Sequence, residues 1–289
     1  MELIKKQIHM NQWKGNVTTQ ITLDDDFIVP DTMDDMEQVM LDTGEIQIET
    51  VKNQGDKVAV KGKLEFQVLY RKESGGLQTL GGNIPFEEVV NVQGLEEKDY
   101  VGLNWMLEDL NTDMINSRKL GVQAIITLQV RVETLRDVEA AVDVDIENNS
   151  RPAGAGMSDT DGAGQVQGET LKRTANAAAI AVRRKDTYRI KEELSLTGGK
   201  PNIGQLLWRE MKLRDVTAKP LDGRLHLDGE LSVFVIYGAE DENMPVQWLE
   251  ETIPFSGDME MGDVKEDQIP MVTVRLAHKD MEAKPDYDG

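Results

Sequence analysis

The stretch VAVKGKLEFQVLY (residues 58–70) alternates apolar and polar side chains along its length. The stretch LHLDGELSVFVIY (residues 225–237) repeats this alternation 167 positions further on. Successive side chains of a β-strand point to opposite faces, so a period of two predicts strands with one buried face and one wetter face. The positions expected to be buried are Val58, Val60, Leu64, Phe66, Val68 and Tyr70, and Leu225, Leu227, Leu231, Val233, Val235 and Tyr237.

The repeat extends beyond this strand. The aligned segments are 36–41 with 203–208, 50–52 with 217–219, 84–86 with 253–255 (after two extra residues in the second copy) and 113–114 with 280–281. Their constant order and nearly constant offset indicate duplication of one module. We therefore predict that the two copies fold alike, with Leu64 and Tyr70 in the core places of Leu231 and Tyr237.

Further strands, turns and short helices are predicted around these segments. Residues 122–133 alternate as a strand, and residues 18–22 and 188–196 are expected to be the strands that open each copy. Turn sequences are 53–56, 74–76 and 221–223. Short helices are predicted at 31–40 and 201–208, each after an Asp or Asn cap. Residues 169–184 favour a helix by propensity, with a strand leading into Tyr188 as the alternative.

The domain organisation follows from a change in composition. Residues 148–168 are small, polar and glycine-rich, and they cannot bury enough apolar surface to offset the entropy lost on ordering. We interpret them as a flexible linker between a first module (residues 1–147) and a second module (residues 169–289); a long surface loop inside one domain is the alternative. The predicted fold is mainly β: two related β-sandwich or partly open barrel modules with short helices, joined by a Gly-rich linker.

Charge and composition exclude several classes of protein. The 289 residues include 32 basic and 53 acidic side chains, which give a net charge of -21. This acidic excess argues against binding to nucleic acid or to anionic lipid through a basic surface. No apolar run reaches the roughly 18 residues that a membrane span needs. The N-terminus lacks the apolar core of a signal peptide, and there is no cysteine, so a cytosolic protein is expected.

Candidate catalytic and metal-binding residues are few. His9, His226 and His278 stand in unrelated positions without metal-ligand spacing. The acidic clusters at 24–26, 143–147 and 159–162 lack the glycine and glutamate of a calcium loop. The glycine-rich segments 162–168 and 198–200 miss the phosphate-loop spacings. We predict no enzyme, no catalytic or cofactor-binding residue and no metal site; a hydrolase that uses an acidic pair is an alternative.

One further feature concerns partner binding. Phe234 and Ile236 lie on the strand face opposite Val233 and Val235, so this strand is apolar on both faces. A small helix or the other copy is one expected cover, and docking of another protein is the second. The partner-binding residues are therefore left open.

Several strings together resemble the SPOCS-domain family of clostridial spore-coat proteins. They are TTQITLDDDFIVP (18–30), KDTYRIKEEL (185–194), KPNI (200–203), GELSVFVIY (229–237), PVQWLE (245–250) and KPDYDG (284–289). The resemblance covers both modules and leaves the linker unmatched. It carries over no functional residue, because the strings are structural signatures.

The resemblance implies a non-enzymatic morphogenetic protein, made in the mother-cell cytoplasm and located at the forespore surface. Its implied partners are spore coat proteins, including a SpoIVA-like ATPase. In this family a C-terminal LysM domain contacts that ATPase, and residues 1–289 contain no LysM domain. The alternative function is a surface or carbohydrate-binding β module, although only 5% of the residues are aromatic.

The alignment of the two copies also gives an expectation about the last residues of the sequence. Gly289 corresponds to Val122, where the last strand of the first copy begins. We therefore expect the second module to lack its closing strand, and the sequence to be part of a longer polypeptide. The unpaired backbone of the neighbouring strand would then take up a strand from another chain or from the N-terminal segment, with self-association as one outcome.

Overall fold

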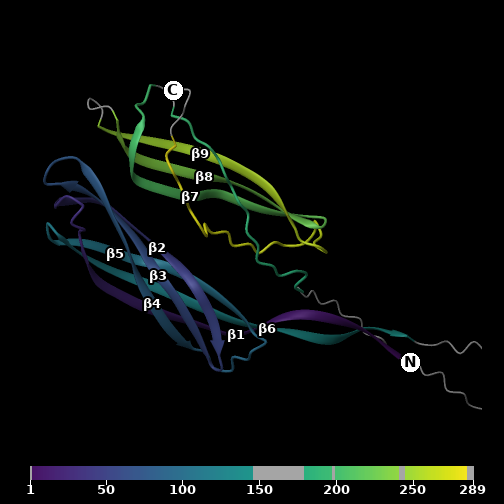
Figure 1. Cartoon of the computed structure of the whole chain (residues 1–289). Helices are drawn as coiled ribbons and strands as arrows, with labels where there is room; N and C mark the ends of the chain where they lie inside the picture. Colours follow the sequence, from purple (N-terminus) through teal and green to yellow (C-terminus); the bar gives the residue numbers. More distant parts are fainter. Residues whose placement is uncertain (1, 146–178, 197–198, 241–244, 285–289) are drawn as a thin grey trace, which may run out of the picture. The chain divides into compact units, whose positions relative to one another are not determined.

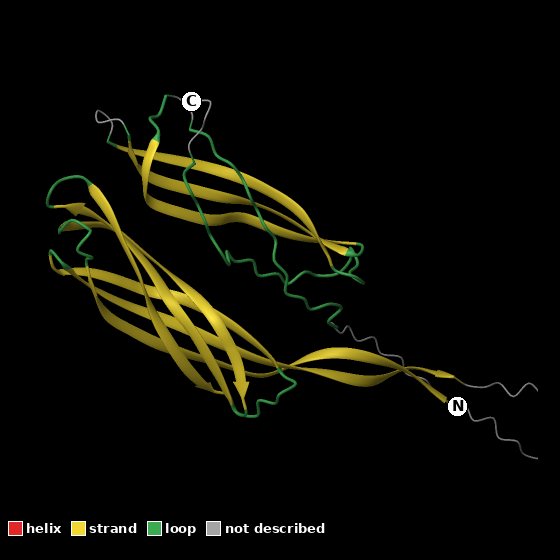
Figure 2. Cartoon of the chain, in the orientation of Figure 1, coloured by secondary structure: helices red, strands yellow, loops and turns green. Residues whose placement is uncertain are grey.

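The computed structural model describes residues 2–145, 179–196, 199–240 and 245–284, and over these residues the chain is built from strands (Figures 1 and 2). The strands are β1 (Glu2–Ile28), β2 (Met36–Gln54), β3 (Lys57–Lys72), β4 (Leu77–Asn91), β5 (Tyr100–Asn116), β6 (Lys119–Asp145), β7 (Ile203–Leu221), β8 (Arg224–Ala239) and β9 (Val246–Glu260). They form three three-stranded sheets, with the orders β1-β6-β5, β2-β3-β4 and β7-β8-β9.

The first module is a sandwich of two sheets over one core. Alternate residues of β3, among them Leu64 and Val68, pack in the same cluster as Ile126 and Leu128 of β6. Because β3 and β6 are the middle strands of their sheets, their inward side chains are almost completely buried. Of the two predicted alternatives, the sandwich is therefore the observed one for this module, and neither sheet closes into a barrel.

The outer parts of β1 and β6 form a separate unit. Residues 2–12 and 134–145 belong to this unit, and Lys5 Nζ lies 3.0 Å from Glu139 Oε2 across it. Both strands are longer than the sequence predicted, since strands were expected only at 18–22 and 122–133. These outer residues keep the extended conformation, and many of their side chains are exposed.

The described strands of the second module make one antiparallel sheet whose strands match β2, β3 and β4. β7 and β8 begin 167 positions after β2 and β3, and β9 begins 169 positions after β4. The cross-strand pairs match as well: Leu64 lies opposite Ile84, and Leu231 lies opposite Ile253. The predicted core positions of both copies are buried, including Tyr70 and Tyr237, so the predicted equivalence of these strands is confirmed.

The predicted helices are wrong within the described residues. β2 starts at Met36 and β7 at Ile203, inside the segments assigned to helices, and residues 179–184 are neither helix nor strand. A capping residue and a short apolar run are weak signals, and pairing with β3 or β8 outweighs them here. The predicted strand at 188–196 is also absent. The predicted linker 148–168 and residues 169–178 lie outside the described residues.

The predicted turns are confirmed. The three turn segments join β2 to β3, β3 to β4 and β7 to β8, respectively. Gly55 and Gly223 each have a positive φ, 68° and 77°, which side chains other than glycine rarely adopt. The hairpins therefore begin and end where the glycine-containing turn sequences predicted.

Candidate binding surface of the second module

The three histidines lie apart, and only one of them joins a larger polar cluster. His9 contacts Asp137 in the outer ribbon, and His278 is exposed on the segment after β9. In the described residues no group of three His, Cys, Asp or Glu side chains could hold a metal ion. In the same residues there is no helix long and apolar enough to cross a membrane.

His226 of β8 lies between side chains of its own strand and of β9. Its Nδ1 is 2.6 Å from Asp258 Oδ1, and its Nε2 is 3.1 Å from Asp228 Oδ2. The Ser256 hydroxyl lies 3.4 Å from the same Nε2. The register explains the cluster, because His226 and Asp258 are direct cross-strand partners. Sequence reasoning missed it, since these residues are about thirty positions apart and only strand pairing brings them together.

This cluster resembles a serine–histidine–aspartate set in its residue types, but its charges oppose that use. The hydrogen bond with Asp258 raises the pKa of His226, and the charge of Asp228 raises it further. Because Nε2 also contacts the carboxylate of Asp228, the imidazole tends to keep its proton rather than accept one from Ser256. The arrangement therefore acts as a charge cluster on the exposed side of the sheet.

The raised pKa of His226 gives a pH dependence of stability with a defined sign. The folded state binds this proton more tightly than the unfolded state, whose histidine has the ordinary value of 6.5. The stabilisation is therefore complete below that value and is lost as the pH rises through the folded-state pKa. We expect H226Q to lower the denaturation midpoint more at about pH 5.5 than at about pH 8.5. An equal decrease of the denaturation midpoint at both pH values would contradict a stabilising role of protonated His226.

The two modules share a tyrosine that is tied to the chain entering the sheet. The Tyr70 hydroxyl donates to the Asp34 carbonyl oxygen at 3.0 Å, and the Tyr237 hydroxyl donates to the Pro201 carbonyl oxygen at 3.2 Å. The two acceptors are again 167 positions apart. Both rings are fully buried, so each tyrosine fixes the entry of β2 or β7 to the core.

A second shared feature is a glycine covered by a phenylalanine ring. Gly62 pairs with Phe86, and Gly229 pairs with Phe255. A Cβ atom on either glycine would lie within 2.8 Å of the ring of its partner. The two positions therefore require glycine for the same steric reason in both modules.

The comparison with protein families agrees with this duplication. The family described as "SipL, SPOCS domain" matches residues 35–115 and 202–284, together more than half of the chain. The chain belongs to the SPOCS-domain family. The family is sporulation-related and is not a known enzyme family. No curated protein and no solved structure matches the chain.

The two SPOCS regions begin at equivalent places, just after the carbonyl groups that Tyr70 and Tyr237 contact. They cover β2 to β5 in the first module, and β7 to β9 with the following segment in the second. Of the strings that carried the sequence resemblance, 229–237 and 245–250 lie inside a matched region, whereas 18–30 and 185–194 lie outside.

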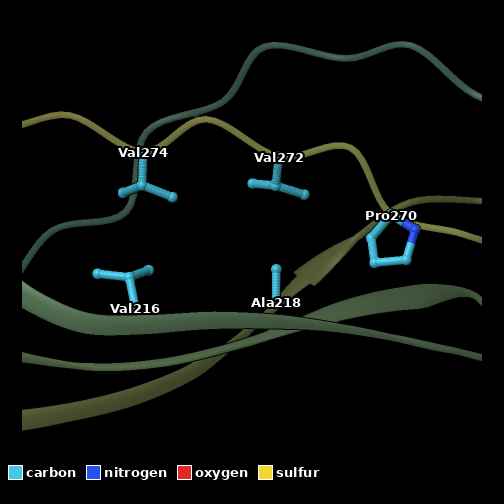
Figure 3. Close-up of a pocket in the computed structure, with 5 residues that line it drawn as sticks. All are labelled: Val216, Ala218, Pro270, Val272 and Val274. Carbon is cyan, nitrogen blue, oxygen red and sulfur yellow. The ribbon is translucent and has the colours of Figure 1, made fainter.

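A groove lined by apolar side chains and by backbone lies on the second SPOCS region. Val216 and Ala218 of β7 face Pro270, Val272 and Val274 of the segment after β9, around a cavity of about 300 Å³ (Figure 3). All five side chains are apolar, and the facing side chains leave space between them in the close-up. Such a groove has no group for acid–base chemistry, but it suits the side chains of another polypeptide.

The apolar side chains of Phe234 and Ile236, on the outer face of β8, are partly covered by other apolar side chains. Phe234 and Ile236 are half-buried in a cluster that includes Leu207 and Trp208. The Phe234 ring also lies 6.4 Å from the ring of Trp248, which is itself 57% exposed. Docking of a partner on this face stays a hypothesis.

Proposed function

We propose that the chain is a non-enzymatic structural protein of the bacterial spore coat that acts through protein–protein contacts. The observation that carries the proposal is the pair of SPOCS regions, each built on the same three-stranded sheet. The groove of the second module is lined by the side chains of Val216, Ala218, Pro270, Val272 and Val274, none of which is a catalytic group, and this suits binding rather than chemistry.

The proposal includes a location and a class of partner. The protein would act in the mother-cell cytoplasm at the forespore surface, with spore coat proteins as partners. A SpoIVA-like ATPase is one of these partners, and its contact is proposed to need a LysM domain outside residues 1–289. With a net charge of -21, the chain would approach basic or neutral protein surfaces more readily than acidic ones.

The test follows a fluorescent fusion of the chain in a spore-forming bacterium during sporulation. We expect fluorescence to appear in the mother cell and to collect around the forespore, and deletion of the gene to leave the coat incomplete or detached. The matched variants are Y237A, which should lose the forespore signal because its module unfolds, and Y237F, which should keep it. Diffuse fluorescence together with an intact coat in the deletion strain would overturn the proposal.

A further inference from the structure

The outer edge of β9 is covered by side chains rather than by another strand. β9 is an edge strand of its sheet, because β8 is the one described strand that pairs with it. The backbone groups on the other side of an edge strand can pair with a strand of another chain. Two exposed apolar side chains of the same strand, Val246 and Trp248, increase this tendency.

Three side chains that precede β7 donate hydrogen bonds to this edge, and we call them the edge donors. The donor–acceptor pairs are Arg184 Nη1 with the Glu260 carbonyl oxygen at 2.6 Å, the Tyr188 hydroxyl with the Ser256 carbonyl oxygen at 2.9 Å, and Lys200 Nζ with the Trp248 carbonyl oxygen at 2.6 Å. All three acceptors have even residue numbers. Successive carbonyl groups of a strand point to opposite sides, so the even-numbered carbonyl groups of β9 face away from β8. The edge donors therefore occupy acceptors near both ends of the edge.

Two of the edge donors also pack against side chains of β9. The centroid of the Tyr188 ring lies 6.1 Å from that of the Phe255 ring, and Lys200 Nζ lies 5.0 Å from the centroid of the Trp248 ring. Gly257 leaves room for Tyr188, since a Cβ atom at this position would collide with the tyrosine ring. Packing and hydrogen bonds together therefore hold these two side chains at the edge.

A proline lies between the acceptors on the same edge. Pro254 has an even number, so its nitrogen, which carries no hydrogen, faces away from β8. β4 has Pro85 at the equivalent place, opposite Lys63, and β4 is also an edge strand of its sheet. A proline on an edge withholds one donor from an incoming strand. Both modules therefore lack a donor at this edge.

The first module has a similar contact beside β4, although its second sheet is present. The Thr19 hydroxyl of β1 lies 3.4 Å from Glu88 Oε1 of β4. At the offsets of 167 and 169 positions, these two residues correspond to Asp186 and Gly257. Gly257 is the residue that contacts Tyr188, two positions from Asp186. The chain before the shared sheet therefore runs beside the same edge in both modules.

We propose that residues 184–196 and Lys200 form an edge guard, which prevents β9 from pairing with β9 of a second copy of this chain. Two copies of β9 can pair antiparallel about a twofold axis, because such a pair is self-complementary. The edge donors and Pro254 remove hydrogen bonds that this pair needs. Glu250 and Glu260, both exposed on β9, add repulsion between like charges. The inference does not depend on a role in the spore coat, because it rests on the contacts of β9 alone.

The test removes the edge donors from the full chain and follows self-association by sedimentation velocity. The variant R184A/Y188F/K200A loses the three hydrogen bonds and keeps the aromatic ring at position 188. We expect its association constant to be at least about tenfold higher than that of the unaltered chain. The control R189A changes an exposed arginine of the same segment and should leave the association constant unchanged. Equal association of the triple variant and the unaltered chain would overturn the proposal.

A further substitution locates the new contact on β9. T252P, added to the triple variant, places a second proline among the residues that face the edge, so the gain in association should be lost. Hydrogen exchange of β8 checks that all variants stay folded, and exchange of β9 should slow when the triple variant associates. Association that persists with T252P, or that leaves the exchange of β9 unchanged, would overturn the proposal. Self-association of the unaltered chain that protects β9 would also overturn it.

Discussion

Replacing Tyr70 with alanine is expected to lower the free energy of unfolding of the first module by about 3–5 kcal/mol, as other large-to-small aromatic changes in cores do. The ring is fully buried, so its removal leaves a cavity between the two sheets. The hydroxyl also donates to the Asp34 carbonyl oxygen, so the start of β2 loses an anchor. Chemical denaturation followed by far-UV circular dichroism measures the change.

The conservative variant Y70F separates the contribution of the ring to the free energy of unfolding from that of the hydroxyl. Y70F keeps the packing and loses only the hydrogen bond, so a loss of about 1 kcal/mol is expected. Y237A should destabilise the second module for the same reasons, because Tyr237 is equally buried and contacts Pro201. A loss below about 1 kcal/mol for Y70A would contradict a core position for this ring.

Replacing Gly62 with alanine is expected to destabilise the first module by about 3 kcal/mol, at the upper end of what overpacking costs. The new Cβ would lie 2.6 Å from the Gln47 carbonyl oxygen and 2.8 Å from Phe86 Cζ. The first of these atoms belongs to the backbone of β2, so the clash moves a strand rather than one flexible side chain.

A glycine in the other sheet of the first module provides the control. Gly102 of β5 has room for a Cβ atom, whose nearest contact would be Tyr100 Cε1 at 3.6 Å. G102A should therefore change the free energy of unfolding by no more than about 0.5 kcal/mol. If G62A and G102A had equal effects in the same denaturation assay, the steric explanation would be wrong.

Alternation made part of the fold predictable. A period of two identified β3, β6 and β8, and the repeat showed that the two copies correspond, but β2, β4, β5, β7 and β9 were not predicted as strands. Helices were wrongly predicted where a short polar cap precedes a few apolar residues, as at 31–40 and 201–208. Such local signals contain no information about the strand that later pairs with the segment, and that pairing decides the outcome.

Residues 188–196 show a second reason why a prediction from the sequence can fail. Their alternation resembles that of a strand, and their side chains do pack on the sheet, as Leu196 shows. A strand also needs a partner backbone, and within the described residues of the second module no strand stands where β6 stands in the first. The alternating pattern therefore predicted a strand that the segment does not form.

The candidate surface was the least predictable part. The groove combines residues of β7 with a segment that follows β9 by several residues, and the cluster around His226 combines two strands. No short motif connects these positions. The groove was therefore not predicted from the sequence.

One SPOCS sheet occurs twice, as β2-β3-β4 and as β7-β8-β9, but residues 267–283 lie outside any sheet, whereas their counterpart β5 pairs with β6. Hydrogen–deuterium exchange of the free full chain tests this difference by comparing equivalent segments of the two copies. We predict comparable slow exchange in β3 and β8, but exchange at least about a hundredfold faster in residues 267–283 than in β5. Equal protection of residues 267–283 and β5 would contradict the claim.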